Sequence, residues 1–578
     1  MRKFILFVLI ACNCFVSLFS ISCSEKHRCT YDVKTISSEY LKSPASCQAR
    51  AEYYYVCECG KIGSETFFDG YKLDHDFTAE VVDEKYLIQQ GTCQEGATYY
   101  KSCVHCGQKA NLLKTFTVNV FADCSFDQEI ADVEYLYSEA TKTQSAVYYK
   151  SCVCGKVGNE TFSYGEPLKE YTDEEKKPYT PVSLTVTLFD TEVGVYGFTC
   201  NTEMKPLRPV LQIAKGNSLD NAVEYNAIVE KASTYLTNNT PYDYYIVKAE
   251  AKLEKNATYT YRIYDKYVDT GTKLATLNTK DLNAQSFSFV HVADTQEYPE
   301  KFKDVLKIVS PTTDFLLHTG DVVETSKYES EWKAMLNGNF KYLSSIPFMA
   351  ISGNHETTYQ NGSNETYKHF HNKIPSQVST TKGYFYSFVY GNVKFIMLNT
   401  NDLSSNKLKK EQYDWLINEL ENNNSTWTVV AMHNPMYSVG KYGADSSKNA
   451  ISLSLRSQLQ GIFNQYGVDI VLQGHDHAVS RTFPIDGNGN PKSENIETIN
   501  GVDFTINPEG VLYLMNGTAG GQTRSPYSTD SNLYKYAQAS NECSWAQFDI
   551  DGNKLSVSVN YYTSSGIKTY QKWGIKKQ

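Results

Sequence analysis

Apolar and polar positions follow two alternating patterns along the second half of the chain. Short apolar runs are separated by amphipathic stretches, and this arrangement predicts buried strands between helices. Residues 285–578 are therefore expected to form an α/β domain around a largely buried sheet. Expected strands are FSFVHVADT, FLLHTGD, FMAISGN, VKFIMLNT, WTVVAMH, VDIVLQGH and VLYLMNG. Expected helices are Glu300–Val309, Glu329–Leu343, Lys410–Glu421 and Leu453–Tyr466.

A different pattern precedes this region, across residues 180–282. Its segments alternate apolar with polar residues, are rich in Val, Tyr and Thr, and are separated by turn residues. This period of two predicts an antiparallel β-sandwich of about one hundred residues. The expected strands are VSLTVTLFD, VYGFTC, PVLQIAKG, YYIVKAEAKL and TYTYRIYDK.

The first third of the chain, residues 23–170, is an internal repeat that concentrates the cysteines. Ten of the 15 cysteines lie between Cys29 and Cys154. Three copies share a Tyr-Tyr pair, a close pair of cysteines and a following glycine, as expected of small repeated modules. Equal spacing defines four register positions in each copy. They hold Cys29, Cys47, Cys57 and Cys59, then His75, Cys93, Cys103 and Cys106, then Cys124, Lys142, Cys152 and Cys154.

The residues at these register positions distinguish disulfides from zinc. Imidazole can replace thiolate on zinc, but it cannot form half of a disulfide, so His75 favours zinc in the second copy. Lys142 cannot ligate zinc as an ammonium, and the third copy is expected to be degenerate. For the first copy, disulfides and structural zinc stay equally open, because cysteines usually pair in an oxidising compartment. The role expected of the repeats is spacing or adhesion.

The N-terminus indicates export. Arg2 and Lys3 precede an apolar stretch that ends in small residues, which is the pattern of a secretory signal peptide over residues 1–22. An uncleaved signal anchor is the alternative, because the stretch is nearly long enough to cross a bilayer. Eight N-x-S/T triplets agree with a secreted or cell-surface glycoprotein. No later segment is expected to span a membrane, and the formal net charge of -10 gives no reason to expect nucleic acid as a partner.

The expected strands of the α/β region end in polar residues able to bind a metal. Open α/β sheets place their sites outside the carboxyl ends of strands, so separate strands can deliver these groups to one crevice. Carboxylate, amide and imidazole donors suit a pair of cations that activate a water and stabilise a leaving oxygen. Each motif alone is weak, and the prediction rests on the ordered set. The candidate ligands are Asp294, Asp321, Asn354, His433, His475 and His477.

The ordered series ADTQ, TGDVVE, SGNHE, VVAMHNP and QGHDH resembles the calcineurin-like metallophosphoesterase superfamily and, within it, the purple acid phosphatases. The resemblance covers about residues 287–562. It implies a multidomain protein in which a four-layer α/β sandwich follows a fibronectin type III-like β-sandwich and the small Cys-rich repeats. It also implies two divalent or trivalent metal ions, with iron, zinc and manganese as the candidates.

The resemblance further implies roles for the residues of the series. A metal-bound hydroxide would attack phosphorus in line, and His355 would protonate the leaving oxygen. Asp321 would bridge the two metals. The first metal would be held by Asp294, Asp321 and His477, and the second by Asp321, Asn354, His433 and His475.

Two positions depart from the purple acid phosphatase pattern. That family has a tyrosine three positions after the bridging aspartate, where this chain has Glu324. Without a tyrosinate ligand, the purple colour and a strong ferric preference are both in doubt. Gln296 stands where the family has glycine, or histidine in the wider superfamily, and it is expected to lie behind the ligands rather than on the metal.

The leading hypothesis is therefore a secreted phosphoesterase that hydrolyses small phosphate monoesters, with acid phosphatase-like activity. A phosphodiesterase or nucleotidase with the same metal centre is one alternative, because substrate choice depends on the loops around the site. A surface adhesion protein with a vestigial catalytic domain is the alternative from another class.

Overall fold

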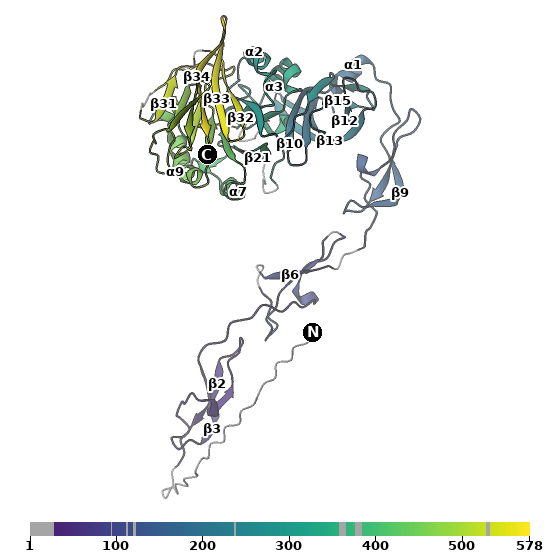
Figure 1. Cartoon of the computed structure of the whole chain (residues 1–578). Helices are drawn as coiled ribbons and strands as arrows, with labels where there is room; N and C mark the ends of the chain where they lie inside the picture. Colours follow the sequence, from purple (N-terminus) through teal and green to yellow (C-terminus); the bar gives the residue numbers. More distant parts are fainter. Residues whose placement is uncertain are drawn as a thin grey trace, which may run out of the picture. The chain divides into compact units, whose positions relative to one another are not determined.

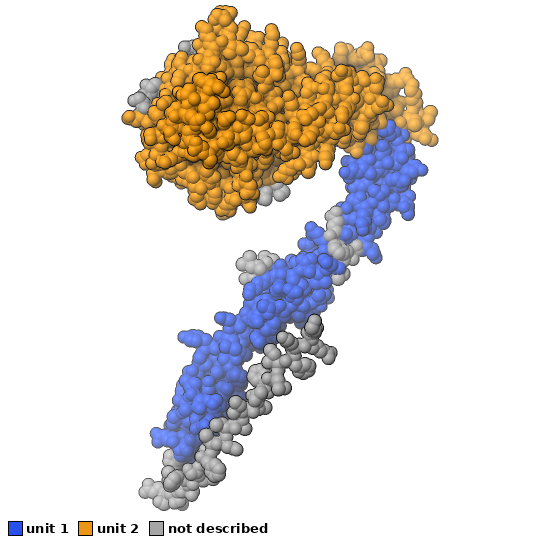
Figure 2. All heavy atoms as spheres, viewed as in Figure 1, with its two compact units in different colours: residues 1–139, 146–165 blue, residues 140–145, 166–578 orange. Residues whose placement is uncertain are grey.

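The computed structural model divides the chain into two units, which Figure 2 distinguishes by colour. One unit contains Met1–Glu139 and Ala146–Gly165, and the other Ala140–Ser145 and Glu166–Gln578. The expected signal peptide lies outside the described residues, and no described helix is both long and apolar enough to cross a membrane. The structure describes residues 28–93, 95–110, 114–119, 123–235, 239–357, 366–375, 384–527, 532–540 and 542–578.

The first unit contains three antiparallel sheets of three strands each within its described residues. In each sheet a stacked aromatic pair joins the second strand to the third, with ring centroids 5.6–5.8 Å apart. A short 3-10 turn (η1 Ser38–Tyr40, η2 Glu84–Tyr86, η3 Val133–Tyr135) leads into each first strand. The strands, labelled in part in Figure 1, are β1 Leu41–Ser43, β2 Ala51–Val56, β3 Ile62–Asp69, β4 Leu87–Gln89, β5 Ala97–Tyr100, β6 Thr115–Val118, β7 Leu136–Ser138, β8 Ala146–Ser151 and β9 Val157–Tyr164.

The second unit begins with two short helices, α1 (Asp173–Lys176) and η4 (Lys177–Tyr179), and then forms an antiparallel β-structure. Its strands are β10 Val182–Asp190, β11 Val195–Thr202, β12 Pro209–Lys215, β13 Val223–Tyr235, β14 Pro241–Lys252, β15 Thr258–Asp265, β16 Thr270–Gly271 and β17 Ala275–Asn278. They pair in the order β10-β11-β14-β13-β12-β15-β16, and β17 pairs with β15. Phe198 of β11 lies 4.8 Å from Tyr261 of β15, ring to ring, so the two halves of this structure share a core.

Two mixed sheets form the centre of the remaining domain. The first pairs its strands in the order β20-β19-β18-β32-β33-β34-β29-β28, and the second in the order β21-β22-β25-β26-β30-β27-β31. The first contains β18 Ser286–Val292, β19 Phe315–His318, β20 Phe348–Ala350, β28 Ile496–Ile499, β29 Val502–Ile506, β32 Ser544–Asp551, β33 Lys554–Thr563 and β34 Gly566–Lys576. The second contains β21 Tyr386–Tyr390, β22 Val393–Leu398, β25 Trp427–Met432, β26 Ile470–Gln473, β27 Val479–Thr482, β30 Leu512–Asn516 and β31 Tyr534–Gln538. A separate hairpin pairs β23 Leu403–Ser404 with β24 Lys407–Leu408.

These sheets face each other and are covered by helices on their outer faces. Between the sheets, Phe289 of β18 packs edge to face on Phe395 of β22 at 5.1 Å. Phe302 and Trp332, from α2 and α3, belong to a cluster with the outer face of the first sheet, while α7 and α9 supply the cluster on the second. The domain therefore has four layers, helix–sheet–sheet–helix. The helices are α2 Pro299–Val309, α3 Glu329–Gly338, α4 Phe340–Leu343, α5 Asn354–Thr357, α6 Thr366–His369, α7 Lys410–Glu421, α8 Lys441–Ala444 and α9 Ala450–Gln465.

The seven expected strands are all present and are divided between two sheets, which agrees with the four-layer sandwich that the resemblance implied. Two details differ from the sequence-based expectation. The first sheet is completed by β32, β33, β34, β29 and β28, and the β-structure before it by the long β13; the sequence analysis did not predict these strands. The helix expected over Glu329–Leu343 is interrupted at Asn339, whose side-chain amide donates to the carbonyl of Met335 at 2.9 Å.

The β-structure packs directly on the four-layer domain. Asn201 of β11 donates from its side chain to buried Glu329 at the start of α3, at 3.0 Å. Thr185 of β10 donates through its hydroxyl to the carbonyl oxygen of His369, at 2.9 Å. These contacts hold α3 and α6 in place from outside the domain.

Candidate metal centre

The candidate ligands follow the carboxyl ends of strands that lie side by side. In the first sheet, β18, β19 and β20 are parallel neighbours, and Asp294, Asp321 and Asn354 lie two to four residues beyond their ends. In the second sheet, β25 and β26 are also parallel neighbours, and they lead to His433 and His475. The arrangement of strand ends that the sequence predicted is therefore present.

Asp321 lies among three of the other candidates. Its Oδ2 atom is 3.3 Å from Nε2 of His433, and the ligand atoms of Asp321, His433 and His475 all lie within 4.8 Å of one another. Oδ1 of Asn354 is 2.9 Å from the same His433 nitrogen. Four donors from four separate loops thus converge on one point.

Asp294 and His477 form the adjoining pair. Oδ1 of Asp294 is 3.3 Å from Nε2 of His477, and the backbone N–H of His475 donates to both oxygens of the Asp294 carboxylate at 3.0 and 3.1 Å. The sequence-based hypothesis required Asp294 and His475 to lie on the same side of the structure, and this contact joins them directly.

Backbone carbonyls orient the imidazole rings. The Nδ1 atom of His433 lies 2.8 Å from the carbonyl oxygen of Thr319, and that of His477 lies 2.5 Å from the carbonyl oxygen of Gln522. Each ring therefore places its proton on Nδ1 and turns Nε2 toward the carboxylates. Outer contacts of this kind fix the tautomer of a metal-binding histidine.

The centre is buried on one side and open on the other. Asp294, Asp321, His433 and His477 are at most 1% exposed, whereas His475 is half-buried. Burial lowers the pKa of His433, but the Asp321 carboxylate more than reverses this and raises the pKa to about 9. Burial likewise opposes ionisation of Asp321, yet the facing His433 imidazolium holds the pKa of this carboxyl below its usual value. Buried charges are thus paired with each other, as their desolvation requires.

Comparison with known proteins identifies this region. Residues 287–479 match the sequence model of the calcineurin-like phosphoesterase family. Residues 287–479 are therefore similar to a calcineurin-like phosphoesterase domain. Over 200 residues it is 29% identical to purple acid phosphatase 23 of Arabidopsis thaliana, covering 33% of this chain and 38% of that protein. Over 233 residues it is 27% identical to human acid phosphatase type 7, covering 36% of this chain and 49% of that protein.

The fold of the phosphoesterase domain has a solved counterpart. A purple acid phosphatase from yellow lupin seeds superposes with a TM-score of 0.59 at 17% sequence identity, covering 75% of this chain and 80% of that one. The superposed 75% of this chain is longer than the phosphoesterase domain, so the match includes residues before 287. The chain spans less than half the length of the two curated relatives it matches.

The residues of this phosphoesterase site fit a dinuclear metal centre of the kind the family implies. Two carboxylates, one amide oxygen and three imidazoles are the donor types that iron, zinc and manganese accept. They fall into two adjoining groups, the pair of Asp294 with His477 and the cluster around Asp321. Both groups are formed by acid–imidazole contacts at 3.3 Å, which a bound cation can take over once the imidazole is neutral.

The backbone at the site is held in a rarely used conformation. Asp294, Asp321, His475 and His477 have φ angles of 53°, 58°, 77° and 53°. Left-handed backbone is uncommon outside glycine, although Asp and His tolerate it better than most residues. Such strain costs about 1–3 kcal/mol per residue and persists only where the surroundings enforce it. The four residues therefore owe their positions to the fold around them.

Gly353 allows two ligand loops to approach each other. A Cβ atom at this position would lie 2.0 Å from Oδ1 of Asp321 and 2.3 Å from its backbone nitrogen. Any side chain here would displace the Asp321 loop. The glycine of the G-N-H-E motif is thus explained by close approach as well as by the turn.

Glu356 is a residue for which the sequence analysis gave no role. Its side chain is fully buried and accepts backbone N–H groups from Asp321, Val322 and Gly353 at 2.9, 2.9 and 2.7 Å. It ties the loop after β19 to the loop after β20. Its place in the G-N-H-E series was the available signal, but the backbone donors it binds could not be read from the sequence.

The two positions that depart from the family pattern both contact the site. Nε2 of Gln296 donates to Oδ2 of Asp321 at 3.1 Å, the same oxygen that faces His433. Glu324 lies beside His355: its backbone oxygen is 2.5 Å from Nδ1 of that ring, and its carboxylate is 3.6 Å from the same atom. His355 itself approaches Asp321, with Nε2 3.8 Å from Oδ2.

The histidines outside the series have other surroundings. His318 lies within β19, and burial lowers its pKa to about 3, as expected of a neutral ring packed in a strand. His371 pairs with Glu250 of β14 at 2.9 Å. Tyr442 does face the site, with its ring 4.1 Å from the His475 ring.

Proposed function

We propose that the protein is a metal-dependent phosphoesterase that hydrolyses small phosphate monoesters. The observation that carries this proposal is the buried cluster of Asp321, His433 and His475 beside the Asp294–His477 pair, within a calcineurin-like phosphoesterase domain. The relatives that match the domain include a purple acid phosphatase and a human acid phosphatase.

Two metal ions held by these residues and by Asn354 would supply Lewis acidity and an activated water at the phosphorus atom. The residues of the chain would prepare for this in three ways. The backbone N–H of His475 holds Asp294 in place, the Thr319 carbonyl fixes the tautomer of His433, and Glu356 ties the Asp321 loop to the loop after β20.

His355 is the proposed general acid. Burial lowers its pKa, but Asp321, the Glu324 carbonyl and the Glu324 carboxylate raise it above the ordinary value. The ring therefore holds a proton on Nε2 at mildly acidic pH, on the half-buried edge of the site. A proton at that atom can pass to a departing alkoxide or phenoxide.

Metal identity and location belong to the same proposal. Glu324 replaces the tyrosine of the purple enzymes, so a colourless pair containing zinc or manganese is proposed in place of a ferric tyrosinate centre. The N-terminal signal and the N-x-S/T triplets support secretion or display at the cell surface.

The test is hydrolysis of an aryl phosphate and of its bis-aryl diester by purified full-length protein loaded with zinc, manganese or iron. We expect the monoester to be preferred, and we expect Asp321→Ala to abolish turnover. Asp503→Ala, an exposed substitution on β29, is the matched control and should leave turnover unchanged. Preference for the diester would support a phosphodiesterase, and inactivity with every metal would support an adhesion protein.

A further inference from the structure

The cysteine clusters of the first unit do not follow the boundaries of the sequence copies. We refer to residues 29–69, 75–118 and 124–164 as the first, second and third modules. One cluster contains Cys47, His75, Cys103 and Cys106, and another contains Cys93, Cys124, Cys152 and Cys154. In each cluster, three residues come from one module and the fourth comes from the module before it.

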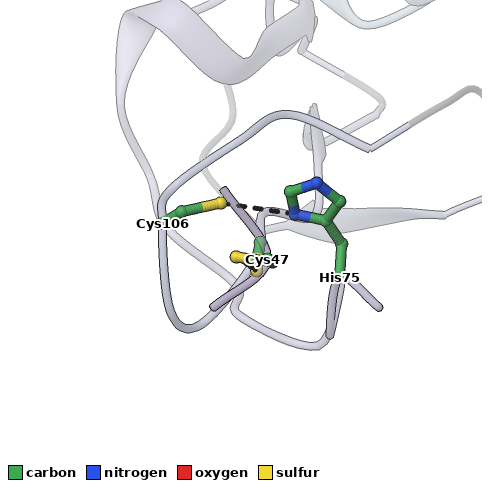
Figure 3. Close-up of side chains that lie close together, drawn as sticks. Cys47, His75 and Cys106 are labelled. Carbon is green, nitrogen blue, oxygen red and sulfur yellow. Dashed lines mark hydrogen bonds between the residues drawn. The ribbon is translucent and has the colours of Figure 1, made fainter. Parts of the chain in front are cut away.

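The first of these clusters has the geometry of a four-coordinate site. Sγ of Cys47 lies 3.8 Å from Sγ of Cys103, and Sγ of Cys106 lies 3.3 Å from Nδ1 of His75. Figure 3 shows Cys47, His75 and Cys106 pointing toward one another. All four ligand atoms lie within 4.8 Å of one another. Tetrahedral zinc with bonds of about 2.3 Å to sulfur sets such atoms roughly 3.8 Å apart.

The second cluster repeats the arrangement with four thiols. Sγ of Cys93 lies 3.4 Å from Sγ of Cys152, and Sγ of Cys124 lies 3.5 Å from Sγ of Cys154. A disulfide requires about 2.05 Å between its sulfur atoms. The spacing again fits ligands arranged around an ion.

The cysteine pair within each module is presented by the same tight turn. The N–H of Gly60, Gly107 and Gly155 donates to the carbonyl oxygen of Cys57, Cys103 and Cys152, at 2.8 Å in all three modules. Each of these glycines has a φ between 72° and 85°, which a glycine adopts without strain. Two thiols held on one rigid turn are preorganised for a shared ion.

The cysteine that joins the next module also occupies a repeated turn. The N–H of Ser46 donates to the carbonyl oxygen of Ala49, and the N–H of Thr92 to that of Glu95, both at 2.8 Å, so that Cys47 and Cys93 lie in matching turns. This turn follows the first strand of its module and comes ten positions before the cysteine pair of the same module. Its thiol nevertheless lies with the ligands of the following module.

In the third module the corresponding turn carries a lysine, Lys142, instead of a cysteine. The N–H of Thr141 donates to the carbonyl oxygen of Gln144 at 2.8 Å, which places Lys142 where Cys47 and Cys93 stand. In the first and third modules, the segment after the third strand also binds this turn in the same way. The N–H of Leu73 donates to the carbonyl oxygen of Ser46 at 3.0 Å, and the N–H of Leu168 donates to that of Thr141 at 2.8 Å. Two residues beyond these leucines stand His75 and Glu170.

Lys142 and Glu170 form an exposed ion pair. No fourth module follows in the sequence, so this turn has no next cluster to complete. The lysine that suggested a degenerate third copy is therefore a terminal residue of the series. The three cysteines of the third module are still joined by a fourth ligand, Cys93 of the second module.

We propose that each of these two clusters binds one zinc ion, and that each ion links a module to the one before it. Cys₃His and Cys₄ are ligand sets of structural zinc. Modules this small bury little apolar surface, and zinc binding supplies folding energy to such domains. The first module shows a three-thiol group of Cys29, Cys57 and Cys59 among the described residues, and the proposal does not extend to it.

The experiment compares metal retention in full-length variants. Wild type, His75→Ala, Cys93→Ser and Lys142→Ser are dialysed against a zinc-selective chelator, and zinc, iron and manganese are measured together. We expect His75→Ala and Cys93→Ser each to lose one zinc per chain relative to wild type, and Lys142→Ser to lose none. Metals of the phosphoesterase domain cancel in this comparison, and unchanged aryl phosphatase activity confirms that the phosphoesterase domain of each variant is folded.

A thiol count on wild type tests the same proposal without a variant. The protein is prepared without reductant, unfolded with chelator and alkylated, and the modified residues are found by mass spectrometry. We expect all seven cysteines of the two clusters to be alkylated, and in native protein to be protected until chelator is added. Blocked thiols that label only after reduction would mean disulfides and would overturn the proposal, as would equal zinc content in wild type and both ligand variants.

Discussion

Replacing Glu356 by glutamine tests whether the buried carboxylate positions the metal centre. One oxygen of Glu356 accepts the N–H groups of Asp321 and Gly353, and the other accepts those of Val322 and, at 3.4 Å, Val323. Glutamine has nearly the same shape but only one acceptor oxygen, and its –NH₂ group would face backbone N–H groups. In either of its two orientations two donors lose their partner.

The expected cost follows from these contacts. An unmade hydrogen bond to a buried donor costs about 1–3 kcal/mol, and bonds to a charged acceptor are worth about 1.5–3 kcal/mol. We therefore expect Glu356→Gln to lower the free energy of unfolding by about 2–4 kcal/mol, which is a fall in Tm of roughly 4–10 °C. Substitution of groups that orient metal ligands typically lowers metal affinity or activity 10–100-fold, and we expect kcat/KM to fall within that range.

The protein should be assayed with metal bound. Burial and the Asp321 carboxylate raise the pKa of Glu356 to about 7, so the metal-free site carries this group partly protonated near neutrality, whereas neighbouring cations favour the carboxylate. Glu329→Gln is the control, because Glu329 is equally buried but bonds Asn201 and His369 away from the centre. It should lower Tm without changing metal affinity. Wild-type kcat/KM and metal affinity in Glu356→Gln would refute the positioning role.

Three further predictions concern the same centre. Gly353→Ala should lower kcat/KM at least 100-fold, because the new Cβ would lie 2.0 Å from Asp321 Oδ1. Gly338→Ala is the control and should leave activity unchanged, because a Cβ atom there would meet nothing within 4 Å. Glu324→Gln should shift the alkaline limb of the pH profile of kcat/KM toward lower pH. The Glu324 carboxylate raises the pKa of the His355 acid, and this acid must be protonated to act. An unmoved limb would exclude this role of Glu324. Chelation should abolish activity and lower the free energy of unfolding by about 2.7 kcal/mol per site for an ion present at 100 times its Kd. Zinc, manganese or iron should restore both, and retained activity without metal would contradict the proposed centre.

The candidate site could be predicted because its signals are local. Asp294, Asp321 and His433 each follow an apolar run. The rule that parallel strands present their carboxyl ends at one edge brings Asp294 and Asp321 together, because β18 and β19 are parallel neighbours, whereas His433 follows a strand of the second sheet. The helices Lys410–Glu421 and Leu453–Tyr466 were found within a few residues for the same reason. In these cases a short stretch of sequence contains the whole pattern.

What could not be predicted depends on partners far away in sequence. The antiparallel part of the first sheet begins with β32, which pairs with β18 more than 250 positions earlier, and continues through β33 and β34, which pair in turn. The donors to Glu356 are backbone groups, which carry no residue-specific signal. The cysteine register was read correctly, but the grouping of Cys47 and Cys93 with the following module depends on how the turns are placed in space.

Backbone strain at the metal centre indicates what the surrounding fold must supply. Asp294, Asp321, His475 and His477 are all left-handed, and at about 1–3 kcal/mol each their combined cost is comparable to the 5–15 kcal/mol by which a typical domain is stable. The bonds from Glu356 to the Asp321 loop and from the His475 N–H to Asp294 oppose that cost directly. Because these bonds do not require a metal, the ligands are held near their final positions before any ion binds. The free energy of ion binding therefore does not have to offset the cost of ordering the loops. Loosening either bond should therefore weaken metal binding even though neither Glu356 nor the His475 N–H is a ligand.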